Sequence, residues 1–183
     1  MASKLAFITG AASGIGAALA RALARRDVSV ALADRQYERA REVADGIERR
    51  GGQAWAVDLD VRDAKGFHRA VEEAVARTGR IDYLFNNAGI TVAGEALQYE
   101  LADWYDVFDV NLRGLVHGVQ AAYPVMCKQG FGHIINTSSM SGLLPTIEAA
   151  SYTATKHAVV GLSKGLRVEA APHGVKVSVL CPG

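Results

Sequence analysis

The sequence has few of the features that would commit it to a metal, a nucleic acid or a membrane. Its two cysteines, Cys127 and Cys181, form no Cys-x-x-Cys pair. Isolated cysteines of this kind fit reduced thiols, so we expect a reducing, cytoplasmic location. The five histidines show no metal-ligand spacing, and we expect no metal site. The net charge of +1 gives no electrostatic case for nucleic acid or an anionic membrane surface.

A long hydrophobic run is also missing. After Lys4, residues 5–20 are uncharged and end in small side chains, as the core of a signal peptide would. Three glycines interrupt this stretch, and it is too short to span a bilayer. A strand, a glycine loop and the start of a helix explain it better, so we predict neither secretion nor a membrane anchor.

What remains is ordinary globular composition, with 50% hydrophobic and 21% charged residues in a chain of 183, enough for one domain with a real core. Apolar runs alternate with helical patterns throughout. We expect strands near residues 4–9, 28–33, 53–60, 81–86, 132–137 and 175–181, and helices near 17–26, 36–50, 64–78, 102–129 and 151–171. The 102–129 helix should be irregular near Asn111 and Gly114. This alternation predicts a doubly wound, Rossmann-like α/β/α parallel sheet.

Three glycines, Gly10, Gly14 and Gly16, lie between the first expected strand and the first helix. Glycine lets the backbone approach a pyrophosphate closely, and a helix N-terminus adds unpaired N–H donors. The spacing is a variant of the common dinucleotide fingerprint, and a simple tight turn is the alternative interpretation.

Asp34 ends the second expected strand, eighteen residues after Gly16. A carboxylate there can accept hydrogen bonds from an adenosine ribose and would repel the 2′-phosphate of NADP. The adjacent Arg35 could instead accommodate that phosphate, but the glycine loop itself carries no basic residue. We therefore expect NAD rather than NADP.

Tyr152 and Lys156 are four residues apart in an expected helix, which places them on one face. A free tyrosine has a pKa of about 10, and a fixed positive charge lowers that pKa. Ser139, thirteen residues before Tyr152, could polarise a carbonyl held against the tyrosine, and Ser138 is its neighbour. These side chains predict a proton-transfer site.

Taken together, the motifs resemble the short-chain dehydrogenase/reductase family along the whole chain. The resemblance rests on residues 9–16 (Thr-Gly-Ala-Ala-Ser-Gly-Ile-Gly), Asn86-Asn87-Ala88-Gly89, Asn111, Ser139, Tyr152-x3-Lys156 and Cys181-Pro182-Gly183. It implies hydride transfer between a nicotinamide cofactor and a secondary alcohol or ketone. It also implies a homodimer or homotetramer.

The same resemblance implies residue roles. Tyr152 would be the general acid/base, while Lys156 would bind the nicotinamide ribose and lower the Tyr152 pKa. Ser139 would hold the substrate oxygen, and Asn111 would hold a water in a proton relay. Cofactor contacts would come from the glycine loop, the strand ends and the chain end: Gly10, Ser13, Gly14, Ile15, Gly16, Asp34, Arg35, Asp60, Val61, Asn87, Ala88, Gly89, Tyr152, Lys156, Pro182 and Gly183.

Two segments, 90–101 and 140–150, should form walls of the substrate pocket. The second contains Met140, Leu143, Leu144, Pro145 and Ile147, which predict an apolar wall and a hydrophobic small-molecule substrate. Within the enzyme class, the alternative is an NADPH-dependent 3-oxoacyl-thioester reductase. From another class, the alternative is a non-catalytic dinucleotide-binding sensor or scaffold on the same fold.

The end of the chain departs from the family pattern. Members usually continue for several dozen residues past the position of Gly183, adding a substrate lid and a seventh strand. We therefore expect residues 1–183 to be a single dinucleotide-binding and catalytic domain that is incomplete at its C-terminus. Either the chain continues beyond Gly183 or it is truly truncated, and we favour the first.

Overall fold

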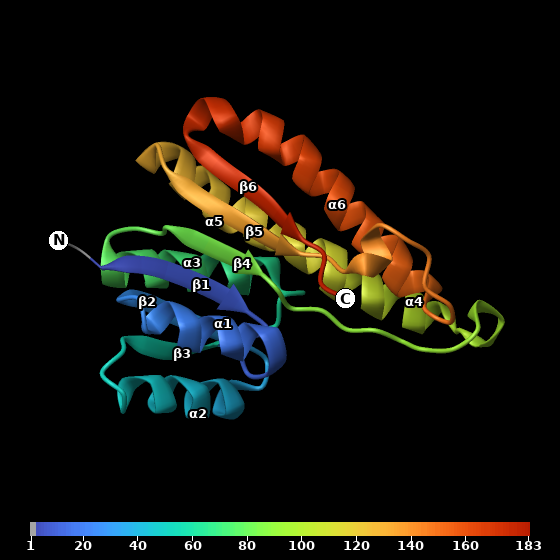
Figure 1. Cartoon of the computed structure of the whole chain (residues 1–183), viewed down its shortest axis with the longest axis horizontal. Coiled ribbons are helices and arrows are strands. Elements are labelled where there is room, and N and C mark those ends of the chain that lie inside the picture. The colour runs from blue at the N-terminus through green and yellow to red at the C-terminus, as the bar shows by residue number, and fades with distance from the viewer. Residues whose placement is uncertain (1–2) are drawn as a thin grey trace.

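Six short strands form one parallel sheet in the computed structural model, which describes residues 3–183 (Figure 1). The strands are β1 (Lys4–Thr9), β2 (Val28–Asp34), β3 (Ala54–Asp58), β4 (Tyr83–Asn86), β5 (Gly132–Thr137) and β6 (Val175–Leu180). Their order across the sheet is β3-β2-β1-β4-β5-β6. The order reverses between β1 and β4, which confirms the doubly wound prediction and places a crevice at the carboxyl ends of these two strands.

Helices cover the sheet from two sides (Figure 1). On one face lie α1 (Gly14–Ala24) and α2 (Tyr37–Glu48), and on the other lie α3 (Ala64–Thr78), α5 (Gly114–Gln129) and α6 (Ala150–Ala170). Each face has its own buried apolar cluster. Successive residues of β1 alternate between them, since Leu5 and Phe7 join the α3 side while Ala6 and Ile8 join the α1 side. A strand buried on both faces explains why its sequence is continuously apolar.

The long helix expected over 102–129 is interrupted where the sequence indicated. It consists of α4 (Leu101–Phe108), a π-helical turn over Asp109–Arg113, and α5. Inside the turn, Asn111 is 2% exposed, and its amide pairs with both backbone groups of Ile90, at 2.8 and 2.9 Å. The extra residue of the π-turn thus brings a polar side chain inward against the segment that follows β4.

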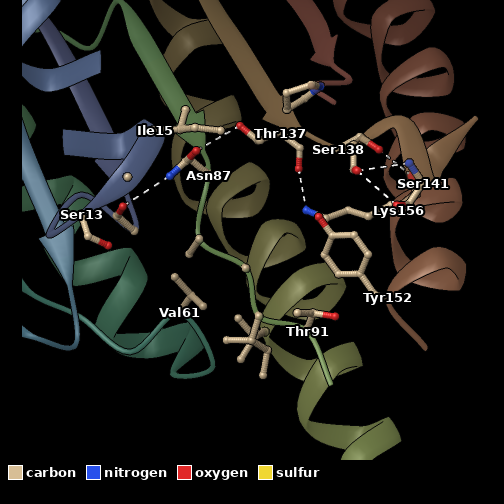
Figure 2. A pocket seen from close by; sticks show the side chains of 18 of the residues that line it. Ser13, Ile15, Val61, Asn87, Thr91, Thr137, Ser138, Ser141, Tyr152 and Lys156 are labelled. Atoms are coloured by element: carbon tan, nitrogen blue, oxygen red, sulfur yellow. Dashed lines mark hydrogen bonds between the residues drawn. The ribbon is translucent and has the colours of Figure 1, made fainter. Parts of the chain in front are cut away.

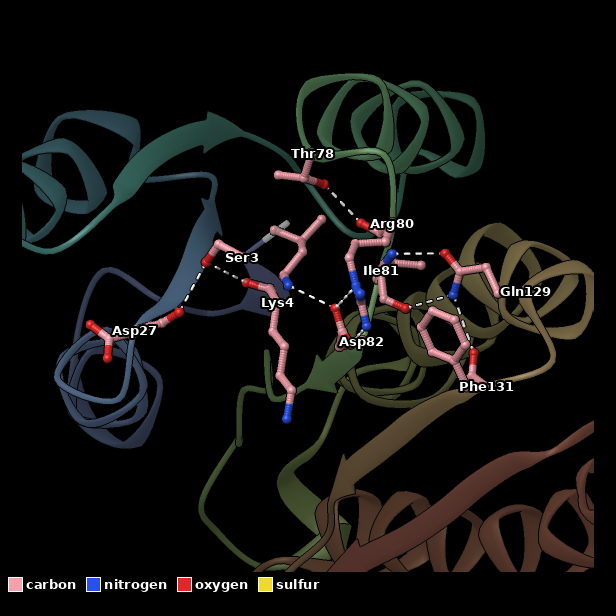
Figure 3. Close-up of polar contacts among 10 residues, drawn as sticks. Ser3, Lys4, Asp27, Thr78, Arg80, Ile81, Asp82, Gln129 and Phe131 are labelled. Carbon is pink, nitrogen blue, oxygen red and sulfur yellow. Dashed lines mark hydrogen bonds and ion pairs between the residues drawn. The ribbon is translucent and has the colours of Figure 1, made fainter. Parts of the chain in front are cut away.

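A polar lock closes the amino end of the sheet (Figure 3). Asp82, which precedes β4, accepts hydrogen bonds from the backbone N–H of Leu5 at 2.9 Å and from Arg80 Nε at 2.8 Å. A second guanidinium nitrogen of Arg80 donates to the other carboxylate oxygen at 2.5 Å. Gln129, at the end of α5, pairs with the N–H and the carbonyl of Ile81, both at 2.9 Å. The polar side chains of Asp82, Arg80 and Gln129 are therefore all hydrogen-bonded within the fold.

Candidate active site

A cleft of about 720 Å³ opens at the carboxyl edge of the sheet. All residues predicted to bind the cofactor line it except Gly16, and the predicted catalytic residues Ser139, Tyr152 and Lys156 line it as well. Asn111 does not reach the cleft and lies behind its wall. Figure 2 shows side chains from the glycine loop, from the end of β4 and from α6 converging on this one space.

The glycine loop contributes backbone rather than side chains. Gly10 has a φ of +65°, and an added Cβ would lie 2.9 Å from the Cα of Ala88. A Cβ on Gly16 would overlap the carbonyl oxygen of Gly10, so Gly16 allows α1 to pack on the loop and does not face the cleft. A Cβ on Gly14, by contrast, would meet no protein atom within 4 Å. Gly14 therefore borders open space on the cleft side.

The residues of the loop fit a pyrophosphate. Ser13 makes no side-chain capping bond at the start of α1, so its hydroxyl leaves the N–H groups of the first turn available. These donors and the positive end of the helix dipole favour an anion. Ser13, Gly14 and Ile15 all line the cleft at this point.

Asn87 braces the crevice where β1, β4 and β5 end. Its Nδ2 donates to the carbonyls of Thr9 at 3.1 Å and Gly10 at 3.3 Å, and its Oδ1 accepts from Thr137 Oγ1 at 3.4 Å. The hydroxyl of Thr9 accepts from the N–H groups of Asn87 and Ala88 at 3.0 and 3.1 Å. Thr9, 2% exposed, was not predicted to have a role of its own. A polar residue at the carboxyl end of an apolar strand was the available signal.

Asp34 faces the cleft and also holds the glycine loop. Its Oδ2 accepts from the N–H of Ala12 at 3.0 Å and its Oδ1 from the N–H of Gln36 at 2.9 Å. Each carboxylate oxygen keeps one lone pair for a ligand. Arg35, which is exposed, lines the same part of the cleft. Asp34 and Arg35, which favour NAD and NADP respectively, therefore both border the cleft.

Asp60 and Val61 form the wall beyond β3. The guanidinium of Arg62 makes charge-assisted hydrogen bonds to Asp60, the shortest at 2.6 Å, and holds the pKa of that carboxyl below its usual value. Val61 is 9% exposed, and its carbonyl lies 2.8 Å from Nδ1 of His117. Both predicted residues line the cleft, with Asp60 committed to Arg62.

The tyrosine–lysine pair lies in the first two turns of α6, as the i, i+4 spacing predicted. Lys156 is 4% exposed, and its Nζ lies 5.3 Å from the ring centre of Tyr152. Its Nζ donates to the carbonyl of Thr137 at 2.9 Å. Burial lowers the pKa of Lys156 to about 8, because the charged form loses hydration. An ammonium has three hydrogens, so the bond to Thr137 leaves two for other acceptors at this cleft-lining residue.

The two serines at the end of β5 have different surroundings. Ser138 is 2% exposed, and its hydroxyl donates to the carbonyl of Lys156 at 2.8 Å, which ties β5 to α6. The hydroxyl of Ser139 accepts from the N–H of Ser141 at 3.1 Å and lies 3.2 Å from Ser141 Oγ. Ser139 is the less buried of the two, and no backbone carbonyl accepts its hydroxyl within the described residues.

The 140–150 segment differs from the apolar wall that the sequence predicted. Leu143, Leu144 and Ile147 are 57%, 57% and 89% exposed, and they do not line the cleft. Ser141, Thr146 and Ala149 line it instead. The prediction was wrong because the segment is irregular, so no sequence period indicates which side chains turn inward.

Asn111 joins the π-turn to α6. Its Nδ2 donates to the carbonyl of Ile90 and to Thr155 Oγ1, at 2.9 and 3.1 Å, which uses both amide hydrogens. A Cβ on Gly89 would lie 3.3 Å from Asn111 Oδ1 and 3.5 Å from Lys156 Nζ, so both side chains come close to Gly89. Pro182 and Gly183 line the cleft, and the N–H of Met140 donates to the Pro182 carbonyl at 2.8 Å.

Other kinds of site are not evident in residues 3–183. No group of three or more His, Cys, Asp or Glu side chains in this range is arranged to hold a metal ion. Within the same range, the structure has no helix with the length and apolarity needed to cross a membrane.

Known proteins resemble the chain over its full length. The family model for short chain dehydrogenase matches residues 4–183. The 2,5-dichloro-2,5-cyclohexadiene-1,4-diol dehydrogenase LinX of Sphingobium indicum is 39% identical, covering 100% of this chain and 73% of that protein. The 3-oxoacyl-(acyl-carrier-protein) reductase FabG of Staphylococcus aureus is 37% identical, covering 99% and 74%.

Solved structures agree in fold and in the kind of cofactor bound. A metagenomic short-chain oxidoreductase in complex with NADP has a TM-score of 0.94 and 35% identity, covering 98% of this chain and 82% of that one. A short chain dehydrogenase/reductase from Burkholderia phymatum in complex with NAD has a TM-score of 0.95 and 36% identity, covering 98% and 65%. The chain belongs to the short-chain dehydrogenase/reductase family, and it is an NAD(P)-dependent oxidoreductase that transfers hydride between a nicotinamide and a CH–OH or carbonyl group.

Proposed function

We propose that the cleft oxidises a secondary alcohol, or reduces the corresponding ketone, with Tyr152 as general acid/base. One observation carries the proposal. The buried ammonium of Lys156 and the ring of Tyr152 lie side by side in a cleft whose other end is a backbone loop suited to a pyrophosphate. The bound nicotinamide supplies the hydride acceptor or donor, and the protein manages the proton.

The chain's own residues divide this work. In alcohol oxidation, the phenolate of Tyr152 accepts the hydroxyl proton of the substrate, and the ammonium of Lys156 lies beside its ring. The hydroxyl of Ser139 donates to the substrate oxygen as charge develops on it. The two hydrogens of Lys156 Nζ that Thr137 does not use are the donors for the ribose hydroxyls. Reduction of the ketone runs the same proton path backwards.

We assign Asn111 to the proton path behind Lys156. Both hydrogens of its amide are already used, by Ile90 and Thr155. A water held here would therefore depend on the remaining lone pair of Oδ1 or on a main-chain carbonyl of the π-turn. Its role is to position the water of the proton path relative to Lys156, not to exchange protons itself.

We propose NAD as the preferred cofactor. Asp34 presents two free lone pairs at the expected ribose position, and its negative charge opposes a 2′-phosphate. The related structures include one with NADP and one with NAD, so the kind of fold does not decide the choice.

Fluorescence titrations with NADH and NADPH test this choice. Wild type should bind NADH at least about 10-fold more tightly than NADPH, because placing the 2′-phosphate against the Asp34 carboxylate brings two negative charges together. The Asp34→Asn variant removes the charge and keeps one acceptor oxygen, which serves either Ala12 or Gln36 but not both, and it should narrow the difference between the NADH and NADPH affinities. Arg35→Gln is the matched control and should leave NADH affinity near its starting value. Tighter NADPH binding by wild type contradicts the proposal.

The substrate we propose is a small secondary alcohol or ketone with at least one further polar group. The wall formed by Ser139, Ser141 and Thr146 is hydroxyl-bearing, while the nearby leucines face solvent. A 3-oxoacyl-thioester reductase is the second candidate, because a reductase of that kind is a 37% identical relative. A panel of cyclohexanol, cyclohexane-1,4-diol, 1-phenylethanol and an acetoacetyl thioester, read by nicotinamide absorbance, separates the two.

The wider assignments remain proposals of the same kind. We propose that one domain both binds the cofactor and carries out catalysis, because a single sheet supplies both halves of the cleft. A homodimer or homotetramer and a cytoplasmic location are proposed by analogy with the family. Light scattering measures the first, and fractionation of the cells that make the protein measures the second.

Tyr152→Phe tests the central role. The change removes one hydroxyl that makes no protein hydrogen bond within residues 3–183, so the free energy of unfolding should stay within about 0.5 kcal/mol. Turnover should fall by at least about 10³-fold, as expected for loss of a general acid/base. NADH binding should persist. Turnover within about 10-fold of wild type would remove Tyr152 from this role.

A further inference from the structure

Three hydroxyl groups form a chain along the cleft wall after β5. Thr146 Oγ1 lies 2.7 Å from Ser141 Oγ, and Ser141 Oγ lies 3.2 Å from Ser139 Oγ. The backbone N–H of Ser141 also donates to Ser139 Oγ at 3.1 Å. All three residues line the cleft. The function proposed above gives Ser139 a role in the reaction, whereas Ser141 and Thr146 enter it only as polar lining of the cleft.

Ser141 is buried, with 7% of its surface exposed, in a short 3-10 turn over Met140–Gly142. Its hydroxyl makes its two contacts within the described residues with Ser139 and Thr146. Burying a hydroxyl is unfavourable unless it is hydrogen-bonded, and alanine would fill nearly the same space without that requirement. A purely structural turn therefore gains little from serine at this position.

The direction of the hydrogen bonds decides what Ser139 can do. A hydroxyl has one hydrogen, and heavy-atom positions fit either direction along the chain. If Ser139 donates to Ser141, its hydrogen is not available to a substrate oxygen. If Thr146 donates to Ser141 and Ser141 donates to Ser139, the Ser139 oxygen accepts two hydrogen bonds and its hydrogen remains available.

The second direction suits the exposure of the three residues. Thr146 is exposed, so water can satisfy the acceptor sites of its hydroxyl while it donates inward. Ser139 then accepts from the N–H and the O–H of Ser141. Successive hydrogen bonds polarise one another, so accepting two of them makes Ser139 a stronger donor.

We propose that Ser141, oriented by Thr146, is a positioning residue that directs the Ser139 hydroxyl hydrogen toward the substrate oxygen. The inference rests on the proposed role of Ser139. In this role Ser141 acts on Ser139 and exchanges no proton with the substrate. It acts by occupying the lone pairs of Ser139, and Thr146 acts by fixing the direction of Ser141.

The test uses the best substrate of the alcohol and ketone panel and measures kcat and KM separately. Ser141→Ala keeps the backbone donor and removes the hydroxyl, and should lower kcat by about 10-fold, the equivalent of one hydrogen bond, with KM within about 2-fold. Thr146→Val should lower kcat by about 3-fold, a smaller loss because Thr146 acts on Ser139 only through Ser141. Thr146→Ser returns the hydroxyl and should recover that loss. Ile147→Ala, on an exposed side chain that does not line the cleft, is the control for disturbance of the loop.

A Ser139→Ala background separates the two proposals. If Ser141 acts through Ser139, then Ser141→Ala should cause no further loss in that background. The same 10-fold loss there overturns the inference, and so does wild-type kcat in Ser141→Ala alone. Near-normal turnover of Ser139→Ala itself would instead overturn the role proposed for Ser139. Urea unfolding midpoints close to that of wild type verify that each variant is folded.

Discussion

The two ends of the sheet each bury one charged side chain, and they treat it differently. Asp82, at the amino end, is 7% exposed, and Lys156, at the carboxyl end, is 4% exposed. Asp82 accepts from two nitrogens of Arg80 and from the N–H of Leu5. Within residues 3–183, Lys156 Nζ makes one hydrogen bond, to a carbonyl, and burial lowers its pKa. The fold neutralises the first charge and leaves the second for a ligand.

The neighbouring polar groups follow the same division. Three buried side-chain oxygen atoms lack a partner among the described residues, and they belong to Asn86, Ser151 and Thr153. Asn86 ends β4, and the other two lie in the first turn of α6, so all three are at the carboxyl end. Groups left partly unsatisfied in an otherwise paired structure are expected where function overrides stability. We infer that the amino end determines stability and the carboxyl end determines chemistry.

The largest expected effect on stability is at the amino end. Asp82→Asn removes the charge that pairs with Arg80, and should lower the free energy of unfolding by about 3 kcal/mol, the low end for a broken buried pair because Arg80 is 30% exposed. Urea titration measures this, and kcat of the folded fraction should not change. Glu38→Gln, in an exposed pair with Arg41, is the control and should change stability by less than about 0.5 kcal/mol. An equal loss of stability in both variants would show that the buried Asp82–Arg80 pair contributes no more than an exposed ion pair.

A smaller effect is expected where the two roles meet, in the glycine loop. In Gly16→Ala the new Cβ would overlap the carbonyl of Gly10, so the backbone must shift, at about 2 kcal/mol of stability. Because Gly10 and Gly14 move with it, NADH affinity should fall by at least about 10-fold, although Gly16 does not line the cleft. Fluorescence titration with NADH checks this. Unchanged affinity would mean that the loop is not held by packing.

The smallest effect should have the opposite sign. Gly165 lies in the exposed part of α6, and a Cβ there would meet nothing within 4 Å. Gly165→Ala should raise the free energy of unfolding by about 0.7 kcal/mol, because alanine loses less backbone entropy in a helix. Turnover should stay at the wild-type level. A loss of turnover would show that the catalytic helix needs flexibility at that point.

The sequence was sufficient for features that depend on local spacing. Apolar runs predicted the strands, and the i, i+4 spacing predicted that Tyr152 and Lys156 share a face. The irregularity predicted near Asn111 is the π-turn. These features follow from backbone periods, which a sequence displays directly.

Features that depend on contacts between distant segments could not be predicted in this way. Asn87 was expected to touch the cofactor, but its amide also joins Thr9, Gly10 and Thr137 across three strand ends. Whether a side chain in the irregular 140–150 segment faces the cleft depends on individual dihedral angles. The prediction of an apolar wall was wrong for that reason. The pairing of Asp82 with Leu5 spans 77 residues and has no local signal.

The central claim is that Lys156 is kept charged and buried at the expense of stability. Its pKa of about 8 in the folded protein lies below the unfolded value near 10.5. The unfolded state therefore binds the proton more tightly, and the penalty is fully present below pH 8 and is relieved as pH rises from about 8 toward 10.5.

Lys156→Met is the most direct measurement, with the free energy of unfolding determined by urea titration at pH 7 and again at pH 10.5. At pH 7 the variant should be more stable by about 2 kcal/mol, from about 3 for the relieved charge less about 1 for the hydrogen bond to Thr137. That advantage should disappear or reverse at pH 10.5, and turnover should be lost. A variant less stable than wild type at pH 7 would contradict the account.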